Sequence, residues 1–389
     1  MLRKYKILYG LEAADAGTLK HLTYLVTSIS AELFDVTVIL STQRSTRVYA
    51  DIEKMTAAGA KILVMPMKRK IVAWQDLKCF LTIWTHLRHH TYDIVHAHSS
   101  KAGILFRLAA WLNQVPLIIY TPHCFYFQSK KGIKKVFFAS VERIMALITS
   151  YIIVANNEKR SALEQNVAPA AKLVNINNAI NFNEYPQADP GNKLTRRLKI
   201  TSDQMVVAAI GRLSVQKNWP MYIKTAAEVI REFEDVIFLI VGDGELQDEL
   251  MAVIKNLEME SRIFFTGHYT HIAEVYALAD IIVSTSLWEG LPYVLLEAMW
   301  YKKPLVATNL NYRNILFEAE NAFLVEPGND KLLAAQIKRL LLDKPKRRAM
   351  GELGHQLLKA NFSFDFFIKK HEEVYTQYAD ILCKQVPCL

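Results

Sequence analysis

Strand-like and helix-like segments alternate along the whole chain, and this alternation limits the possible folds more than any other feature. In the first half, the predicted strands are the short apolar runs 6–10, 36–40, 61–65, 94–98, 117–121 and 151–155. Helical stretches, notably 18–30 and 102–113, fall between them. Such alternation is typical of a parallel sheet covered by helices on both faces. The sequence therefore predicts an α/β protein.

The alternation breaks once, at residues 181–193, where two prolines and a glycine interrupt it. It then restarts, with predicted strands at 205–211, 236–241, 262–266, 281–284 and 305–307. A chain of 389 residues suits two domains. We therefore predict two doubly wound Rossmann-like domains that face each other across a cleft. They are residues 1–185 and 186–363, followed by a C-terminal amphipathic helix at 364–389 that packs back on the first domain.

The net charge of +9 is concentrated in the first half of the chain. Residues 1–185 hold 23 Lys and Arg against 12 Asp and Glu, whereas residues 186–389 hold 24 against 26. One cluster, Lys130-Lys131 with Lys134-Lys135, directly precedes Val136-Phe-Phe138. Cations beside exposed aromatic side chains suit an anionic membrane surface or a lipid-phosphate substrate. The alternative is an ordinary solvated surface. Nucleic acid is not an expected partner, because no motif for it accompanies the charge.

The cysteines and apolar runs favour a reduced, cytosolic setting. The four cysteines show no metal-binding or redox spacing, and no signal peptide precedes the first predicted strand. The longest apolar run, 136–155, contains Glu142 and Arg143 and therefore lacks the ~20 uninterrupted apolar residues of a membrane span. We interpret it as a helix followed by a buried strand. With the basic cluster, the prediction is a cytoplasmic protein peripheral on the cytoplasmic face of the inner membrane.

Glu289 and Glu297 bracket a turn between a predicted strand and a helix that Pro292 is well placed to open. Glu289 therefore lies in the loop at the carboxyl end of the predicted strand, which is where open α/β sheets bind ligands. Carboxylates there can accept hydrogen bonds from vicinal hydroxyls of a ribose or hexose, while the amides at the helix start face phosphate. The pair therefore suggests a sugar nucleotide. The alternative is that Glu289 only complements the helix dipole and Glu297 is a solvated helix position.

Two cations follow another predicted strand in the second half. Arg212 and Lys217, in Gly211-Arg-Leu-Ser-Val-Gln-Lys217, precede a helix and can converge on a phosphate at its start. If the reaction expels a nucleoside diphosphate, they would stabilise the leaving oxygens without a metal. A solvated pair of surface cations is the alternative.

Glycines mark two further strand ends in the second half. Gly242 and Gly244, in Val241-Gly-Asp-Gly-Glu245, allow close approach of the backbone to a ligand. Taken alone, they are better explained by a plain strand-to-helix turn. The segment Phe265-Thr-Gly-His268 ends another predicted strand, and we expect it to contribute backbone contacts to a base.

In the first half, Gly17 and His123 lie at predicted strand-to-helix connections. Gly17 precedes a helix and permits phosphate or sugar to approach the helix amides, or it serves a turn. His123 follows a strand and can hydrogen-bond a reacting sugar or orient the acceptor. The alternative is a structural histidine.

His96 and His98 alternate on one predicted strand and share a face. No third ligand has suitable spacing and no Asp-x-Asp occurs, so a dedicated metal is not expected. His98, Ser99 and Lys101 lead into a helix, and we interpret Lys101 as a contact to an acceptor phosphate. A structural or capping role is the alternative for this stretch.

Taken together, these motifs resemble the retaining glycosyltransferases of family 4, which have the two-domain GT-B fold. The strongest element is Glu289-Gly-Leu-Pro-Tyr-Val-Leu-Leu-Glu297, which is followed by Ala298-Met299 as is usual in the family. Four further segments complete the resemblance in the second half: Gly211-Arg-Leu-Ser-Val-Gln-Lys217, Val241-Gly-Asp-Gly-Glu245, Thr266-Gly267 and Tyr276-Ala-Leu-Ala-Asp280. The first half is similar to a bacterial capsular, exopolysaccharide and O-antigen assembly subgroup through three segments: His96-Ala-His-Ser-Ser-Lys-Ala-Gly103, Thr121-Pro-His123 and Asn177-Asn-Ala-Ile180.

The resemblance implies a role for each matched residue. Glu289 would contact the donor hexose, Glu297 the ribose hydroxyls, Arg212 and Lys217 the diphosphate, and His123 the transferred sugar. The implied donor-binding set also includes Gly17, Gly211, Gly242, Gly244, Gly267, Gly290 and Leu291. Two positions depart from the family pattern: Ala16-Gly17 replaces a usual pair of glycines, and Cys124 replaces a glycine.

The sequence therefore predicts a retaining, metal-independent glycosyltransferase without a cofactor. It would move a sugar from a nucleoside diphosphate donor, most simply a UDP-sugar, to a polyprenyl-diphosphate-linked glycan. Front-face substitution is the favoured mechanism, and double displacement by a carboxylate is the alternative. Two other functions remain open, a sugar-nucleotide 2-epimerase and a non-catalytic sugar-nucleotide-binding protein.

Overall fold

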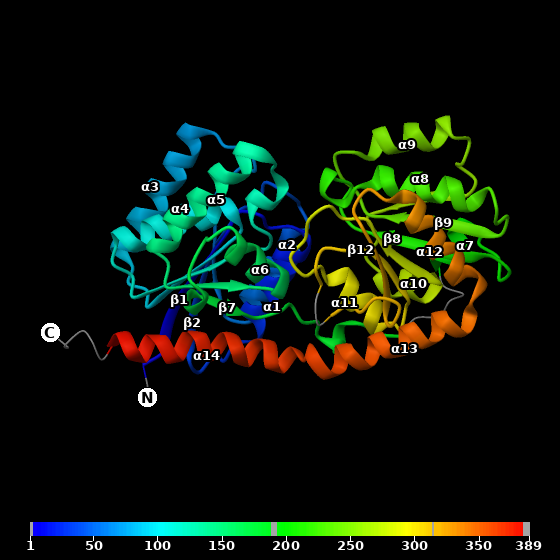
Figure 1. Cartoon of the computed structure of the whole chain (residues 1–389). Helices are drawn as coiled ribbons and strands as arrows, with labels where there is room; N and C mark the ends of the chain where they lie inside the picture. The colour runs from blue at the N-terminus through cyan, green and yellow to red at the C-terminus, as the bar shows by residue number, and fades with distance from the viewer. Residues whose placement is uncertain (1–2, 188–192, 313–314, 384–389) are drawn as a thin grey trace. The chain divides into compact units, whose positions relative to one another are not determined.

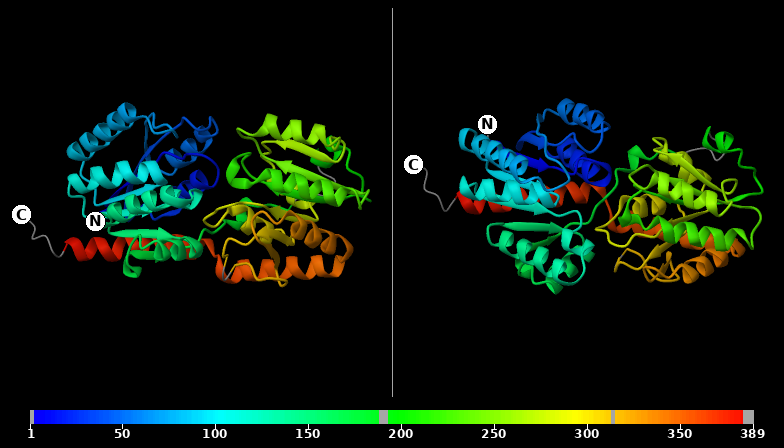
Figure 2. Two further views of the ribbon diagram at one scale, coloured as in Figure 1. Left: turned by 45° about the horizontal axis from the view of Figure 1, so that its top comes forward. Right: turned by 90° about the horizontal axis from the view of Figure 1, so that it is seen from above.

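The computed structural model describes residues 3–187, 193–312 and 315–383, and the chain divides into two compact units (Figure 1). Unit 1 comprises the described residues of Met1–Asn178 and Asp365–Leu389. Unit 2 comprises those of Ala179–Phe364. Figure 2 shows helices on both faces of the sheet within each unit. The predicted α/β class with two Rossmann-like units is confirmed.

Unit 1 contains a seven-stranded parallel sheet in the order β3-β2-β1-β4-β5-β6-β7. The strands are β1 (Tyr5–Leu11), β2 (Phe34–Leu40), β3 (Lys61–Val64), β4 (Ile94–His98), β5 (Leu117–Thr121), β6 (Tyr151–Val154) and β7 (Leu173–Asn175). The helices are α1 (Ala16–Ser28), α2 (Val48–Ala57), α3 (Ala73–His89), α4 (Ser100–Leu112), α5 (Gly132–Leu147), α6 (Asn156–Glu164) and α14 (Phe364–Cys383).

Unit 2 contains a six-stranded parallel sheet in the order β10-β9-β8-β11-β12-β13. The strands are β8 (Met205–Ile210), β9 (Val236–Val241), β10 (Ile263–Gly267), β11 (Ile281–Ser284), β12 (Leu305–Thr308) and β13 (Ala322–Val325). The helices are α7 (Lys193–Leu198), α8 (Trp219–Ile230), α9 (Gln247–Asn256), α10 (Ile272–Leu278), α11 (Tyr293–Trp300), α12 (Asp330–Leu342) and α13 (Lys344–Asn361).

Each sheet has a switch point, where strand order reverses between two neighbouring strands. In unit 1, β1 pairs with β2 on one side and β4 on the other, and the register aligns Leu11 with both Leu40 and His98. In unit 2, β8 lies between β9 and β11. Loops that leave the carboxyl ends of two such neighbours diverge to opposite faces, which opens space for a ligand.

Every predicted strand is present, with ends shifted by no more than a residue or two. The sequence did not predict β7 and β13, which lie at the edges of the two sheets. These are strands of three and four residues, too short to show the alternation or length on which a strand prediction depends.

The boundary between the units precedes the predicted one, which followed residue 185, because the segment after Asn178 already packs on unit 2. The Phe182 ring stacks on Trp300 with the ring centroids 4.4 Å apart. The Trp300 indole N–H donates to the Tyr185 carbonyl (3.1 Å), and the Tyr301 hydroxyl donates to the Pro186 carbonyl (2.9 Å).

The terminal helix α14 contacts the sheet of unit 1 through Tyr375, whose side chain is fully buried. Its hydroxyl lies 2.8 Å from Nδ1 of His96 and accepts a hydrogen bond from the Tyr9 hydroxyl (3.2 Å). These contacts join the end of the chain to β1 and β4.

The apolar run at 136–155 forms α5 and β6, as predicted, and its acidic residue has a buried partner. Glu142 accepts a hydrogen bond from Nη2 of Arg107 (2.8 Å) and another from the Tyr120 hydroxyl (3.2 Å). The Arg107 side chain is 0% exposed, and its guanidinium lies 3.8 Å from the centre of the Tyr120 ring. This ion pair is therefore part of the core that joins α4 to α5.

Replacing Arg107 with methionine should lower the free energy of unfolding by about 3–5 kcal/mol, because the Glu142 carboxylate would stay buried without its cation. The measurement is urea or thermal unfolding. The double variant Arg107→Met, Glu142→Leu should lose less than Arg107→Met alone. Arg160, in an exposed ion pair with Glu164, is the control, and Arg160→Met should cost under about 1 kcal/mol. Equal losses for the two single variants would contradict this account.

Candidate active site

In unit 2, the loops after β8 and β11 bring two predicted residues into contact at the switch point. Nζ of Lys217 lies 2.7 Å from Oε1 of Glu289. Two further residues that the sequence did not single out as ligands complete the contact. Gln216 donates to Oε2 of Glu289 (3.1 Å), and the Ser286 hydroxyl donates to Oε1 (2.9 Å). Glu289 is thus held in place by donors from both loops.

The backbone of the cation loop is fixed by side chains around it. The Trp219 indole N–H donates to the Arg212 carbonyl (2.9 Å), and the Thr285 hydroxyl donates to the Lys217 carbonyl (2.7 Å). Asn218 adopts a left-handed conformation (φ 51°) directly before α8. Lys217 therefore lies just ahead of the amino terminus of α8, where backbone N–H groups and the helix dipole favour an anion.

Arg212 forms a more exposed ion pair than Lys217 does. Its Nη2 lies 3.1 Å from Oε2 of Glu245, and the two side chains are 33% and 42% exposed. Exposed pairs of this kind contribute only about 0–1 kcal/mol. An anionic ligand would therefore compete effectively with Glu245 for the guanidinium group.

The glycines after β8 and β9 serve close packing between neighbouring loops. A Cβ atom on Gly242 would lie 2.0 Å from the Gly211 carbonyl oxygen, and one on Gly244 would lie 2.5 Å from the Leu213 carbonyl oxygen. Gly267, at φ 66°, accepts a hydrogen bond from the Gly242 amide (3.0 Å). Backbone packing thus accounts for Gly242 and Gly244, and their contact with a donor stays a prediction.

Glu297 is buried in α11 and is not the solvated helix position considered as an alternative. The Tyr185 hydroxyl donates to its Oε1 (2.8 Å), and the Tyr276 hydroxyl donates to its Oε2 (2.9 Å). Burial, followed by the nearby carboxylate, raises the pKa of Tyr276 well above its usual value. Gly290 and Leu291 connect Glu289 to α11, which begins one residue after Pro292.

In unit 1, three histidines meet near the switch point between β1 and β4. Nδ1 of His98, the last residue of β4, lies 3.0 Å from Nε2 of His123, which follows β5. His21, from α1, lies with its ring centre 4.6 Å from that of His123. The sequence predicted His98 and His123 but missed His21, because no motif marks a histidine inside a helix.

Burial keeps this histidine cluster neutral. It lowers the pKa of His21 to about 4 and that of His371, a neighbour from α14, to about 3. The pKa values of His96, His98 and His123 also lie well below the usual value, because of burial first and of the neighbouring imidazoles second. The folded protein therefore holds these rings uncharged at neutral pH.

The loop that carries His123 has an unusual backbone. His123 and Cys124 both have positive φ angles, 51° and 87°. This explains why glycine is the usual family residue at the position of Cys124, since glycine adopts such angles without a steric cost. The Glu158 carboxylate accepts hydrogen bonds from the Cys124 and Ala155 amides. Burial raises the pKa of Glu158 to about 7.

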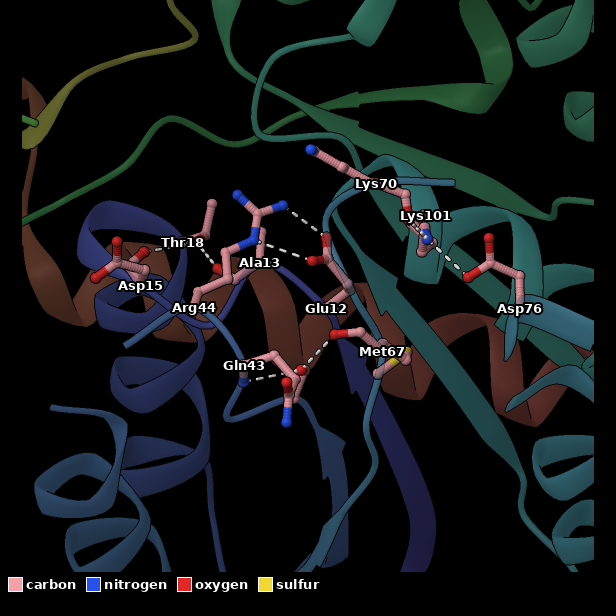
Figure 3. Close-up of polar contacts among 11 residues, drawn as sticks. Glu12, Ala13, Asp15, Thr18, Gln43, Arg44, Met67, Lys70, Asp76 and Lys101 are labelled. Atoms are coloured by element: carbon pink, nitrogen blue, oxygen red, sulfur yellow. Dashed lines mark hydrogen bonds and ion pairs between the residues drawn. The ribbon is translucent and has the colours of Figure 1, made fainter. Parts of the chain in front are cut away.

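Figure 3 shows the polar contacts around the first loop and Lys101. Lys101 donates to Oδ1 of Asp76 (2.7 Å) and to the Lys70 carbonyl (2.6 Å). An acceptor phosphate would have to displace Asp76, and the predicted role of Lys101 stays a prediction. Ser99 precedes α4 with φ 68° and is buried.

An ion pair that the sequence did not predict joins the loop after β1 to the loop after β2. Arg44 donates from Nε and Nη2 to the two carboxylate oxygens of Glu12, at 3.0 and 2.7 Å (Figure 3). Thr18 donates to the Asp15 carbonyl (2.8 Å). Gly17 is the second residue of α1, and Ala16 before it has φ 45°. The usual glycine of the family at position 16 thus also corresponds to a left-handed backbone.

Two α/β units, each with a parallel sheet and with polar residues at its switch point, define the class of two-domain proteins with the GT-B fold. Two family models match the chain, a glycosyl transferase 4-like domain over residues 16–179 and glycosyl transferases group 1 over residues 192–357. The chain is 32% identical over 284 residues to a UDP-Gal:alpha-D-GlcNAc-diphosphoundecaprenol alpha-1,3-galactosyltransferase of Escherichia coli, which covers 71% of this chain and 73% of that protein.

A second relative is the capsular polysaccharide biosynthesis glycosyltransferase CapM of Staphylococcus aureus, 25% identical over 323 residues, covering 81% of this chain and 84% of that protein. Among solved structures, Anabaena HepE in complex with UDP and glucose is similar in fold, with a TM-score of 0.82 and 21% identity. That match covers 96% of this chain and all (100%) of HepE. The chain belongs to the family 4 type of glycosyltransferases.

Lowering the pH from 7.5 to 5.5 should lower the unfolding temperature. Histidines in the unfolded chain take up protons near pH 6.5, whereas His21, His96, His98, His123 and His371 stay neutral in the folded state. Stability is therefore present above pH 6.5 and decreases below it, by up to about 1.4 kcal/mol per histidine and pH unit.

Glu158 acts in the opposite direction, because its pKa is raised in the folded state, but it is one group against five. Thermal scans at several pH values measure the net effect. His21→Gln should reduce the slope. An unfolding temperature that stays constant or rises between pH 7.5 and 5.5 would contradict the neutral cluster.

Proposed function

We propose that the chain is a retaining glycosyltransferase of surface polysaccharide synthesis. It transfers a hexose or N-acetylhexosamine from a nucleoside diphosphate sugar, most simply a UDP-sugar, to a polyprenyl-diphosphate-linked glycan. The observation that carries this proposal is the contact between Lys217 and Glu289 at the switch point of unit 2. The Escherichia coli relative, which uses UDP-Gal and a diphosphoundecaprenol-linked acceptor, supports the choice of donor and acceptor, and the UDP and glucose bound by HepE support the donor. The Staphylococcus aureus relative supports a role in polysaccharide synthesis.

In unit 2, the residues at the switch point suit the parts of a sugar nucleotide. Lys217 and Arg212 supply positive charge for the diphosphate, beside the amino terminus of α8. Glu289 supplies acceptors for hydroxyls of the transferred sugar. Glu297 supplies acceptors for the ribose hydroxyls, in addition to those it offers to Tyr185 and Tyr276. The glycines Gly211, Gly242, Gly244, Gly267 and Gly290, with Leu291, form the surrounding loops.

The environment of Glu289 favours front-face substitution over double displacement. Lys217, Gln216 and Ser286 all donate to its oxygens, and a carboxylate held by a cation and two neutral donors is a poor nucleophile. In front-face substitution, the departing phosphate takes the acceptor proton, and the new bond forms on the face that the phosphate leaves. Arg212 and Lys217 stabilise the charge that develops on the phosphate oxygens, so that the transfer needs no metal.

In unit 1, we assign His123 to the transferred sugar, Gly17 to the donor, and His98, Ser99 and Lys101 to the acceptor. The left-handed backbone at His123 and its hydrogen bond to His98 hold the imidazole in one orientation. A neutral imidazole can both donate and accept a hydrogen bond, as recognition of a sugar hydroxyl requires.

The amino-terminal half of α5 offers a surface suited to an anionic membrane. Lys131 and Lys134 flank Ile133, whose side chain is 86% exposed, and Phe137 is 62% exposed. Exposed apolar side chains among lysines can insert at the headgroup level while the cations contact lipid phosphate. None of the described helices is long and apolar enough to cross a membrane. We propose peripheral association with the cytoplasmic face of the inner membrane.

Arg212→Ala and Glu289→Ala should reduce sugar transfer to background while leaving the fold intact, because each removes a contact to the diphosphate or to the sugar. Sugar transfer is measured with a UDP-sugar as the donor, and binding is measured as the thermal shift that UDP induces. Lys302 forms an exposed ion pair with Glu352 in the same unit, and Lys302→Ala is the matched control.

Arg212→Ala should also weaken the thermal shift that UDP induces, whereas Glu289→Ala should preserve more of it. Wild-type transfer rates in either variant would remove that residue from the site. No thermal shift of the wild-type protein with UDP, GDP, ADP or their sugars would refute the donor site as a whole. UDP binding without any transfer would favour a non-catalytic binding protein.

Replacing Lys130, Lys131, Lys134 and Lys135 with glutamine should weaken binding to vesicles that contain anionic lipid, by about 1 kcal/mol per cation in contact with the surface. Vesicle sedimentation measures the binding. The charge-matched control replaces four exposed cations of unit 2, namely Lys255, Lys331, Lys344 and Arg348. Equal binding of the two quadruple variants would show that Lys130, Lys131, Lys134 and Lys135 belong to an ordinary solvated surface.

A further inference from the structure

The histidine cluster of unit 1 has the geometry of a metal site. His21, His98 and His123 each offer one ring nitrogen, and these three atoms lie within 4.8 Å of one another. Zinc binds imidazole nitrogen at about 2.0–2.1 Å, which places three ligand nitrogens roughly 3.4 Å apart. The rings would therefore have to approach by at most about 1.4 Å to hold a cation between them.

Two buried nitrogens of the cluster are without partners. Among the described residues, neither Nε2 of His21 nor Nε2 of His98 has a hydrogen-bond partner, although the two residues are only 2% and 0% exposed. Buried polar atoms are nearly always paired, so two unpaired nitrogens in one cluster point to a ligand.

The second ring nitrogen of His21 sets its tautomer. Nδ1 lies 2.9 Å from Oδ1 of Asn178, and an amide oxygen only accepts hydrogen bonds. Nδ1 therefore carries the proton, and Nε2 presents a lone pair. Histidine ligands of metals characteristically donate their other N–H to such an oxygen.

We propose that His21, His98 and His123 bind one zinc-class divalent cation. Three imidazoles without a carboxylate favour zinc, nickel or copper over magnesium, calcium or manganese. His123 is the partly exposed member of the three, so water or another small ligand can complete the coordination from its side.

The cation would compete with the function of His123. Coordination would break or redirect the hydrogen bond between His98 and His123 and would occupy the imidazole that we assign to the transferred sugar. Zinc is therefore expected to inhibit transfer. This consequence rests on the proposed function, whereas the metal site itself does not.

The test is binding of zinc to the metal-stripped full-length chain, measured by competition with a chromophoric chelator and by the visible absorption of bound cobalt. The wild-type chain should bind one equivalent at micromolar or lower concentration. His21→Asn and His123→Asn should each weaken binding at least about tenfold. Asn178→Ala should weaken it by about 10–100-fold, because it removes the group that orients His21.

The matched control is the double variant His86→Asn, His90→Asn. These two histidines lie one turn apart on and after α3, with ring centres 4.6 Å apart, and are the alternative place for a cation. The control should bind zinc as the wild type does. Loss of binding in this control with retention in His123→Asn would place the metal on the surface. No zinc binding by the wild-type chain below about millimolar concentration would refute the site.

Discussion

The reversal of strand order within each parallel sheet is the constraint on which both candidate sites depend. In unit 2, the reversal falls between β8 and β11. The loops that follow these two strands bring Lys217 and Glu289 together, with Nζ of Lys217 2.7 Å from Oε1 of Glu289. In unit 1, it places the ends of β1 and β4 side by side, with His98 aligned to Leu11. Without this reversal, both loops would leave on one face of the sheet and would not enclose a ligand.

The two units satisfy this constraint with different chemistry. Unit 2 uses charge: Lys217 is paired with Glu289, and Arg212 with Glu245. In the proposed function, these cations exchange their carboxylate partners for the diphosphate of a sugar nucleotide. Unit 1 buries neutral imidazoles instead, supported by Tyr375 of α14 and by Asn178. That arrangement reduces stability at low pH, and it leaves Nε2 of His21 and Nε2 of His98 without a hydrogen-bond partner among the residues that the structure describes. Such a cost to stability is common at functional sites.

The sequence predicted the parts of the fold and site that depend on local pattern. Central strands are long apolar runs, and the motifs around Glu289 and Lys217 are contiguous. It did not predict β7 and β13, whose runs are too short to show a period. Nor did it predict His21, which joins His98 and His123 only through tertiary packing.

The same limit applies to the partners of the carboxylates. Tyr185 lies 112 residues from Glu297 in the sequence, and no local signal links the two. For Gly242 and Gly244, contact with a ligand stays a prediction, and the structure adds a packing role against Gly211 and Leu213 that no local signal showed. Local spacing predicts which residues lie at a strand end, but tertiary packing decides what they touch.

The most direct test of the proposed reaction is to incubate the protein with a UDP-sugar labelled in the sugar, together with bacterial membrane lipid extract. We predict that label enters the lipid fraction and that NMR of the product shows the anomeric configuration of the donor. An inverted configuration would contradict retention. Label found only in an epimerised nucleotide sugar would contradict transfer and would favour the 2-epimerase.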